Sequence, residues 1–219
     1  MKFADRLKIL LLCSPVLVAA CGLHDLHSPK NANDSGSAAS APSNANPLDM
    51  VTSSMKAQLD AKSFRVRLES SYDGRNTTQV IEYVNPDRIR MTGGPVEVIV
   101  VGSNTYTKLP TGQWQKTPMD VNQMLSSFRD PKIIDELRNS TNVQLVGTDT
   151  VDGMPMKVYQ YTTTNAFGTN ITTTSKAWIA ASDNLPRKIE SEGQINGKPS
   201  KSLVTYYDYN ADIKIEPPM

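Results

Sequence analysis

The sequence predicts an α+β domain built on one large, curled antiparallel sheet that forms an incomplete β-barrel, with helices covering its concave face. Three observations lead to this prediction. The domain begins with a helical pattern of apolar residues, many short segments with an apolar residue at every second position follow, and a second helical pattern interrupts them.

The first 20 residues have the pattern of a secretory signal peptide. Lys2, Arg6 and Lys8 precede an uncharged run over residues 9–20. A transmembrane helix needs about 20 apolar residues, and this run is shorter. We therefore expect residues 1–20 to be a signal peptide that directs export and is then removed.

The predicted signal ends at a cysteine. Val18-Ala19-Ala20-Cys21 resembles the bacterial lipobox, in which the cysteine becomes the lipidated first residue of the mature protein. The resemblance implies that Cys21 carries acyl chains such as palmitate, which hold the chain on a membrane. An ordinary signal peptide followed by an incidental cysteine is the alternative. Gly22, rather than an aspartate, follows the cysteine, which favours the outer membrane facing the periplasm over the outer face of the cytoplasmic membrane.

Residues 21–47 are predicted to be the lipidated cysteine and a flexible linker. The linker is rich in Ser, Ala, Asn, Gly and Pro, and has too few apolar residues to form a core. A flexible coil of this length spans roughly 25 to 30 Å, enough to hold a domain above the lipid headgroups. Both histidines of the protein, His24 and His27, lie in it. A mobile pair lacks the further ligands that zinc takes, so we predict no metal site.

The composition of the remaining domain, residues 48–219, excludes several kinds of active site. It has no histidine and no cysteine, so a Ser-His-Asp triad, a Cys-His pair and a histidine-ligated metal are excluded. We therefore predict no cofactor and no enzymatic activity. The whole chain has 23 basic and 22 acidic residues, a balance that gives nucleic-acid binding no electrostatic support.

The domain is predicted to begin with a helix and to continue as strands. Asn46 can cap the helix and Pro47 suits its first turn. One helix face then carries Leu48, Val51, Met55 and Leu59. From residue 64 the apolar period changes to two, and alternating segments separated by Gly, Pro and Asn turns predict consecutive antiparallel strands.

A helical insert divides the strands into two series. Residues 121–128 carry one apolar stripe, and a second short helix is predicted after Asp130-Pro131. Strands resume with "NVQLVGT" and continue to "SLVTYYDY".

Three phrases in the second half carry a family resemblance. They are "VGTDTVDGMPMKVYQYTTT", "KAWIAASDNLPRKIESEG" and "TYYDYNADIKIEPP". In this order they resemble successive strands of the LolA/LolB and LppX/LprG-like lipoprotein carriers of bacterial envelopes. The matching positions are Gly147, Asp149, Val151, Gly153, Trp178, Leu185, Pro186, Arg187, Tyr207, Asp208, Tyr209, Ile215 and Pro217. The likeness spans most of residues 48–217.

The resemblance implies a membrane-anchored protein that binds lipid, or the acyl chains of other lipoproteins, in an apolar cavity without catalysis. The candidates for a helical lid over this cavity are Met124, Leu125, Phe128, Ile134 and Leu137. The candidates for its sheet side are Phe64, Val66, Leu68, Val98, Val100 and Trp178. For each of them, the alternative is that it fills a solid core.

A second function stays open on the sequence alone. The domain could be an envelope scaffold, solidly packed, that binds another protein on its surface. Four arginines on two early strands could contact phosphate headgroups, although nearby glutamates favour a solvated surface of mixed charge; they are Arg65, Arg67, Arg88 and Arg90.

Overall fold

The computed structural model describes residues 46–118, 142–164 and 171–218. The predicted signal peptide, Cys21, most of the linker and the predicted lid residues lie outside these ranges. The described chain consists of one helix, α2 (Pro47–Asp60), and eleven strands. The strands are β1 (Ser63–Tyr72), β2 (Arg75–Val84), β3 (Arg88–Thr92), β4 (Glu97–Val101), β5 (Asn104–Lys108), β6 (Gln115–Thr117), β7 (Gln144–Val151), β8 (Met154–Thr164), β9 (Ile171–Ala180), β10 (Pro186–Ile195) and β11 (Lys198–Tyr207).

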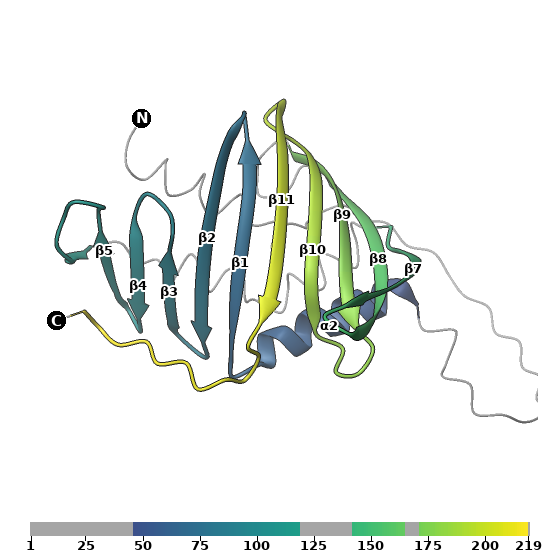
Figure 1. Cartoon of the computed structure of the whole chain (residues 1–219), viewed down its shortest axis with the longest axis horizontal. Helices are drawn as coiled ribbons and strands as arrows, with labels where there is room; N and C mark the ends of the chain where they lie inside the picture. Colours follow the sequence, from purple (N-terminus) through teal and green to yellow (C-terminus); the bar gives the residue numbers. More distant parts are fainter. Residues whose placement is uncertain (1–45, 119–141, 165–170, 219) are drawn as a thin grey trace, which may run out of the picture.

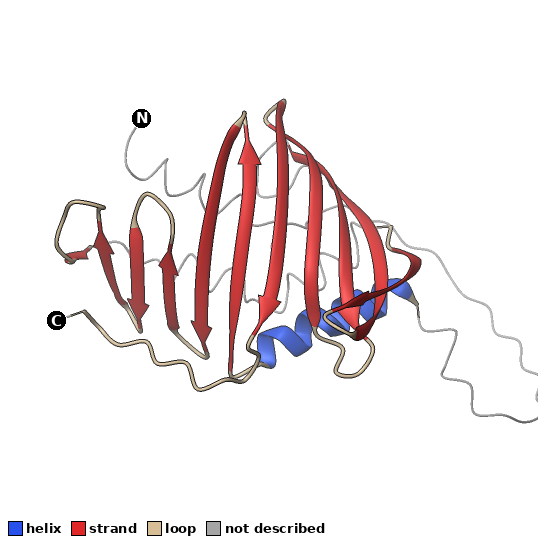
Figure 2. Ribbon diagram, viewed as in Figure 1, coloured by secondary structure: helices blue, strands red, loops and turns tan. Residues whose placement is uncertain are grey.

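All eleven strands form one antiparallel sheet (Figures 1 and 2). Its order is β6-β5-β4-β3-β2-β1-β11-β10-β9-β8-β7, so consecutive strands are neighbours except where β11 returns beside β1. Strands β6 and β7 lie at the two edges and do not pair with each other, so the sheet is not closed into a barrel. The predicted α+β class, with one large antiparallel sheet and an incomplete barrel, is confirmed.

Helix α2 begins where the sequence indicates. The Asn46 side chain accepts a hydrogen bond from the Leu48 backbone N–H at 3.0 Å, and Pro47 occupies the first turn. The helix packs on β7 and β10. We call the face of the sheet that α2 covers the helix-side face, and the other the opposite face. On the inner side of α2, Val51 is buried together with the polar residues Thr52, Ser54 and Gln58.

The helix-side face carries two apolar clusters. The first lies between α2 and strands β1 and β8–β11, with the buried residues Val51, Val66, Leu68, Val143, Tyr159, Tyr161, Ala177, Ile179, Ile189, Val204 and Tyr206. The second lies on β2, β3 and β4, with Tyr83, Ile89, Met91, Val98 and Val100 buried. Phe64 of β1 packs against both clusters.

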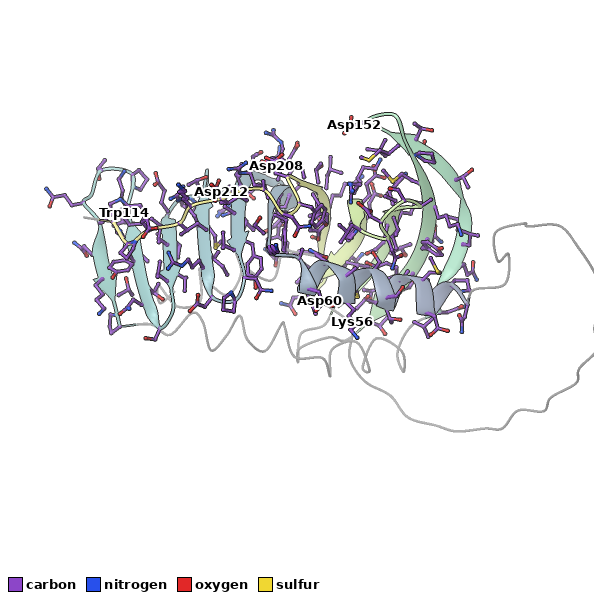
Figure 3. All side chains as sticks on the ribbon, turned by 90° about the horizontal axis from the view of Figure 1, so that it is seen from below. Lys56, Asp60, Trp114, Asp152, Asp208 and Asp212 are labelled. Carbon is purple, nitrogen blue, oxygen red and sulfur yellow. The ribbon has the colours of Figure 1, made fainter. Side chains whose placement is uncertain are left out.

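The opposite face also buries apolar side chains, in two places. Trp178 packs there with Met156, Val158 and Ala180 of β8 and β9. Over β2–β5 the cover is the C-terminal tail, residues 208–218, which crosses the strands and buries Ile213 and Ile215 against Ile99. Figure 3 shows α2 and this tail on opposite sides of the sheet.

Gly193 of β10 provides a test of the sheet's packing. A Cβ atom at this position would lie 2.0 Å from the Thr172 carbonyl oxygen of β9, a backbone atom that cannot move aside. We expect Gly193→Ala to lower the free energy of unfolding by about 3 kcal/mol, at the upper end of the cost of overpacking. Urea unfolding measures the loss.

The matched control is Gly153→Ala in the turn between β7 and β8. Gly153 has φ +78° and no atom within 4 Å of a built Cβ, so only backbone strain of about 1 kcal/mol is expected. Equal losses for the two variants would contradict the close approach of β9 to β10.

Candidate functional site

The second apolar cluster, which we call the apolar site, is the candidate binding surface. Its five residues are Tyr83, Ile89, Met91, Val98 and Val100. The strand register sets them in two rows across β2, β3 and β4: Tyr83 pairs with Ile89 and Ile89 with Val100, while Met91 pairs with Val98. Every side chain of the site is apolar apart from the Tyr83 hydroxyl. Apolar residues arranged in this way can bind acyl chains by removing apolar area from water, and this binding needs no polar groups that recognise a particular ligand.

Two of the predicted lining residues, Val98 and Val100, belong to this site. They are 2% and 1% exposed. Helix α2 packs on β7 and β10, on the other half of the sheet, so it does not account for their burial. Phe64, also predicted, lies at the border of the site, and its ring centroid is 4.9 Å from that of Tyr83.

Val66 and Leu68 lie instead in the first cluster, beneath α2. Leu68 is 2% exposed and its register partner Val204 is fully buried. The same cluster encloses Tyr161, and burial raises the pKa of Tyr161 to about 12, with a hydrogen bond to Ser175 acting in the opposite direction. Aromatic and aliphatic side chains therefore pack against each other here, and the structure places Val66 and Leu68 in a core.

The prediction that Trp178 shares a cavity with these residues needs correction. Ala177 and Ile179 point to the helix-side face, so the strand alternation turns Trp178 to the opposite face. There its indole N–H donates to Asp149 at 2.8 Å, and the Lys188 ammonium lies 3.7 Å above its ring. The hydrogen bond from Trp178 is the main reason why the pKa of Asp149 is lowered. The sheet itself separates Trp178 from the apolar site.

The remaining predicted lining residues cannot be placed. Met124, Leu125, Phe128, Ile134 and Leu137 lie outside the described residues, as does Cys21. Their roles as lid and lipid anchor stay predictions.

A row of hydroxyl groups on the helix-side face was not predicted. The register aligns Ser70 with Thr77 and Ser202, Ser202 with Ser191, and Ser191 with Ser175. Within this row the hydroxyl oxygens of Ser175 and Ser191 are hydrogen-bonded at 2.7 Å, and those of Ser70 and Thr77 are hydrogen-bonded at the same distance. The row borders the first cluster toward the β1–β2 turn. The pairing of β1 with β11, which are far apart in the sequence, joins Ser70 and Thr77 to the other three residues of the row.

The opposite face has a polar depression of about 710 Å³ across β2, β1, β11, β10 and β9. Two of its acidic side chains are paired with cations, Glu69 with the nearby Arg67 at 2.8 Å and Glu192 with Lys201 at 3.0 Å. Its polar lining does not fit an acyl chain. The lining residues with side chains on the opposite face are Glu69, Ser71, Asn76, Thr78, Thr174, Lys176, Glu190, Glu192, Lys201 and Leu203, and the lining also includes Ser70, Thr77, Ser191 and Ser202, whose side chains belong to the hydroxyl row on the helix-side face.

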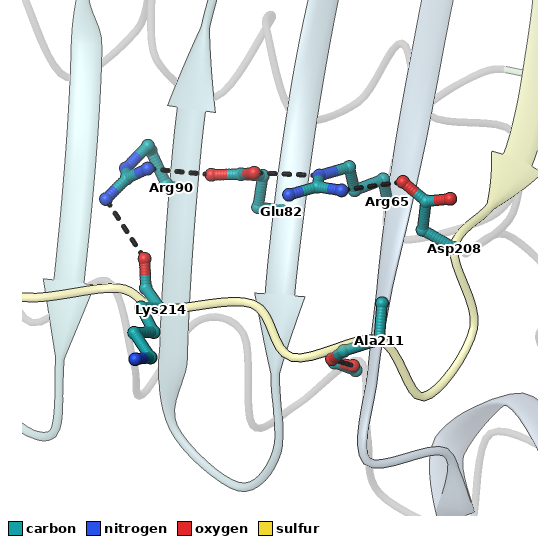
Figure 4. A network of polar contacts seen from close by, with 7 residues as sticks. Arg65, Glu82, Arg90, Asp208, Ala211 and Lys214 are labelled. Carbon is teal, nitrogen blue, oxygen red and sulfur yellow. Dashed lines mark hydrogen bonds and ion pairs between the residues drawn. The ribbon is translucent and has the colours of Figure 1, made fainter.

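The arginines of β1 and β3 are engaged within the protein (Figure 4). Glu82 accepts from Arg65 at 2.8 Å and from Arg90 at 2.9 Å, and Arg65 also binds Asp208 at 2.6 Å. Arg90 donates to the Lys214 carbonyl oxygen at 3.3 Å, so the network reaches the C-terminal tail. Arg88 and Arg67 have their own partners in the Ile215 carbonyl oxygen and Glu69. These contacts support the interpretation as a surface of mixed charge.

The described residues offer no support for two other kinds of site. Within residues 46–118, 142–164 and 171–218, no three His, Cys, Asp or Glu side chains lie together as a metal site would require. In the same ranges, no helix has the length and apolar character needed to cross a membrane.

Comparison with known proteins identifies the fold. No family model and no curated protein matches the chain. Among solved structures, the lipoprotein LppX of Mycobacterium tuberculosis matches with a TM-score of 0.58 and 15% identity, covering 81% of this chain and 100% of that chain. LprF of Mycobacterium bovis matches with a TM-score of 0.54 and 13% identity, covering 78% and 96%. At these identities the likeness shows the fold alone, and it is the LppX-like fold that the sequence resemblance implies.

The arginine network can be tested by removing its central charge. The Glu82 side chain is 15% exposed and lies between two arginines. Glu82→Gln leaves the Arg90 guanidinium without a carboxylate partner and leaves Arg65 with Asp208 alone, so we expect the free energy of unfolding to fall by about 2 kcal/mol. Chemical denaturation at neutral pH measures it.

Glu69→Gln is the matched control, because the Arg67–Glu69 pair is about half exposed on both sides. We expect a change of no more than about 0.5 kcal/mol. If Glu82→Gln lowered the free energy of unfolding as little as Glu69→Gln, the arginine network would not be holding the C-terminal tail, residues 208–218.

Proposed function

We propose that this protein is a membrane-anchored lipoprotein of the bacterial envelope that binds lipid, or the acyl chains of other lipoproteins, without catalysis. The observation that carries the proposal is the apolar site on β2, β3 and β4. Its five side chains are 1% to 8% exposed, although the one described helix packs on the other half of the sheet. An apolar surface of this kind suits acyl chains.

The proposed lid would oppose this surface. The predicted helical stripes contribute Met124, Leu125, Phe128, Ile134 and Leu137, all of them apolar, and the unbranched side chain of Met124 can adapt to variable chains. The support is their periodicity in the sequence together with the LppX-like fold, since LppX is itself a lipoprotein.

The proposed anchor at Cys21 favours a stationary role. A linker that spans roughly 25 to 30 Å keeps the domain close to its membrane, so the protein would accept or hold its ligand rather than cross the periplasm with it. We propose the outer membrane, facing the periplasm, as its location. The protein would then have two kinds of partner. One is the membrane to which it is anchored, and the other is the acyl-bearing lipid or lipoprotein that it binds.

An envelope scaffold that binds another protein is the second candidate. The observation in its favour is on the edge strand β7, where Leu145 and Val146 are 50% and 46% exposed. The register of β7 against β8 shifts between Leu145 and Gly147, so these exposed side chains lie at an irregular point of the edge strand. An extended segment of a partner could add to such an edge.

A substitution that fills the apolar site tests the proposed function. In the full chain, purified in detergent from a bacterial host, native mass spectrometry counts bound lipid. We expect Val98→Phe to remove most of the bound lipid and to leave the midpoint of thermal unfolding nearly unchanged, because the added ring takes space that acyl chains occupy.

Val204→Phe is the matched control in the first cluster, where Val204 is fully buried under α2. Overpacking there should lower the free energy of unfolding by about 1 to 3 kcal/mol and leave the bound lipid in place. If the wild-type chain carries no lipid and Val98→Phe is as destabilised as Val204→Phe, the apolar site is a solid core and the proposal fails.

A further inference from the structure

Three buried hydroxyl groups lack hydrogen-bond partners among the described residues, those of Thr105 on β5, Ser54 on α2 and Tyr206 on β11. Thr105 pairs with Val100 beside the apolar site, whereas Ser54 and Tyr206, which are 2% and 3% exposed, lie on two elements that flank the first cluster. Buried polar groups in proteins are hydrogen-bonded in the great majority of cases, because each unsatisfied one costs about 1 to 3 kcal/mol. Two such groups on facing elements indicate a place where something polar binds.

The hydroxyls of Ser54 and Tyr206 belong to one region beneath α2. Ser54 and Gln58 are four residues apart, so they are neighbours on the inner side of the helix, where both are buried. Burial raises the pKa of Tyr206 well above its usual value, and the nearby Gln58 side chain acts in the opposite direction. The Tyr206 hydroxyl therefore stays protonated and can donate a hydrogen bond.

This region adjoins the apolar site through Phe64. The Phe64 ring centroid lies 6.2 Å from that of Tyr206 on one side and 4.9 Å from that of Tyr83 on the other. A ligand whose chains lie on the apolar site can thus place its polar end beside Tyr206. We call Ser54, Gln58 and Tyr206 the polar end of the site.

The charge of the polar end limits the ligand chemistry. The buried polar side chains of the described residues are Ser, Thr and Gln, with no buried Lys, Arg, Asp or Glu among them. An ionised carboxylate or phosphate would be buried here without a counter-charge, which is strongly unfavourable. A carbonyl oxygen is a neutral acceptor and suits two hydroxyl donors and an amide.

We propose that Tyr206 and Ser54 donate hydrogen bonds to the ester or amide carbonyl of an acyl lipid whose chains lie on the apolar site. This inference rests on the proposed function and narrows its ligand to neutral lipids with ester or amide linkages, as opposed to free fatty acids. Tyr206 is then a specificity-determining residue.

The test compares two lipids that differ only in the carbonyl. The full chain in detergent micelles is given equal amounts of dipalmitoylglycerol and its ether-linked counterpart, dihexadecylglycerol, and native mass spectrometry measures the ratio of bound species. We expect the wild-type chain to prefer the ester about tenfold, which corresponds to about 1.4 kcal/mol. Tyr206→Phe keeps the ring and removes the hydroxyl, so the ratio should fall to about one.

Tyr209→Phe is the control, because the Tyr209 hydroxyl already donates to the Pro186 carbonyl oxygen at 2.9 Å. It should keep the tenfold preference. Thermal unfolding of Tyr206→Phe without lipid provides a second measurement, and a folded variant is expected because only an unpartnered hydroxyl is lost.

The outcomes separate this inference from the function on which it rests. If the wild-type chain binds neither lipid, the proposed function fails and this inference with it. If it binds both lipids equally, or if Tyr206→Phe keeps the ester preference, the acyl-binding function stands and the role of Tyr206 is overturned. An increase in stability of Tyr206→Phe with no change in the lipid ratio would mean that the hydroxyls hold only water.

Discussion

The pairing of β1 with β11 is the interaction on which the rest of the structure depends. These strands pair over eight residues, from Arg65 with Tyr207 to Tyr72 with Ser200, and they join the strand series β1–β6 to the series β7–β11. Without this seam the sheet would be two separate meanders, and the helix-side face would be divided between them (Figure 1). The row of hydroxyls and the contacts of Phe64 with residues of both halves exist only because the seam sets the register.

The chain secures this seam from the opposite face. After β11 it turns at Asp208 and Asn210, both with positive φ, and runs back over β2–β5. The Ser63 backbone carbonyl accepts from the Asn210 N–H at 2.8 Å, and Arg88 donates to the Ile215 carbonyl oxygen at 2.7 Å. The tail thereby covers Ile99, whose neighbours Val98 and Val100 face the other way. This explains why β4 is a continuous apolar run rather than an alternating one.

Local patterns predicted the elements, but not which face each residue takes. The cap at Asn46, the alternation in β1 and the turns between strands depend on neighbouring residues, so the sequence alone was enough for them. Trp178 was assigned to the wrong face because β9 has apolar residues on both faces, and alternation then does not distinguish the two. The pairing of Ser70 with Ser202 and the arginine contacts with the tail depend on the β1–β11 register and on the path of residues 208–218. No pattern among neighbouring residues predicts that register or that path.

The two clusters on the helix-side face differ in composition, and this difference bears on function. The first is covered by α2 and contains three tyrosines, whose rings are rigid. The second combines Met91 with Ile89, Val98 and Val100, side chains that present a smooth aliphatic surface, with methionine able to adapt its shape. Phe64 belongs to the border of both, so a chain that enters the second cluster must contact a ring that also packs on the first. The proposed ligand, an acyl lipid, would have a matching division: its linkage would lie beside the rigid first cluster with its unpartnered Tyr206 hydroxyl, and its chains would lie on the mainly aliphatic second cluster.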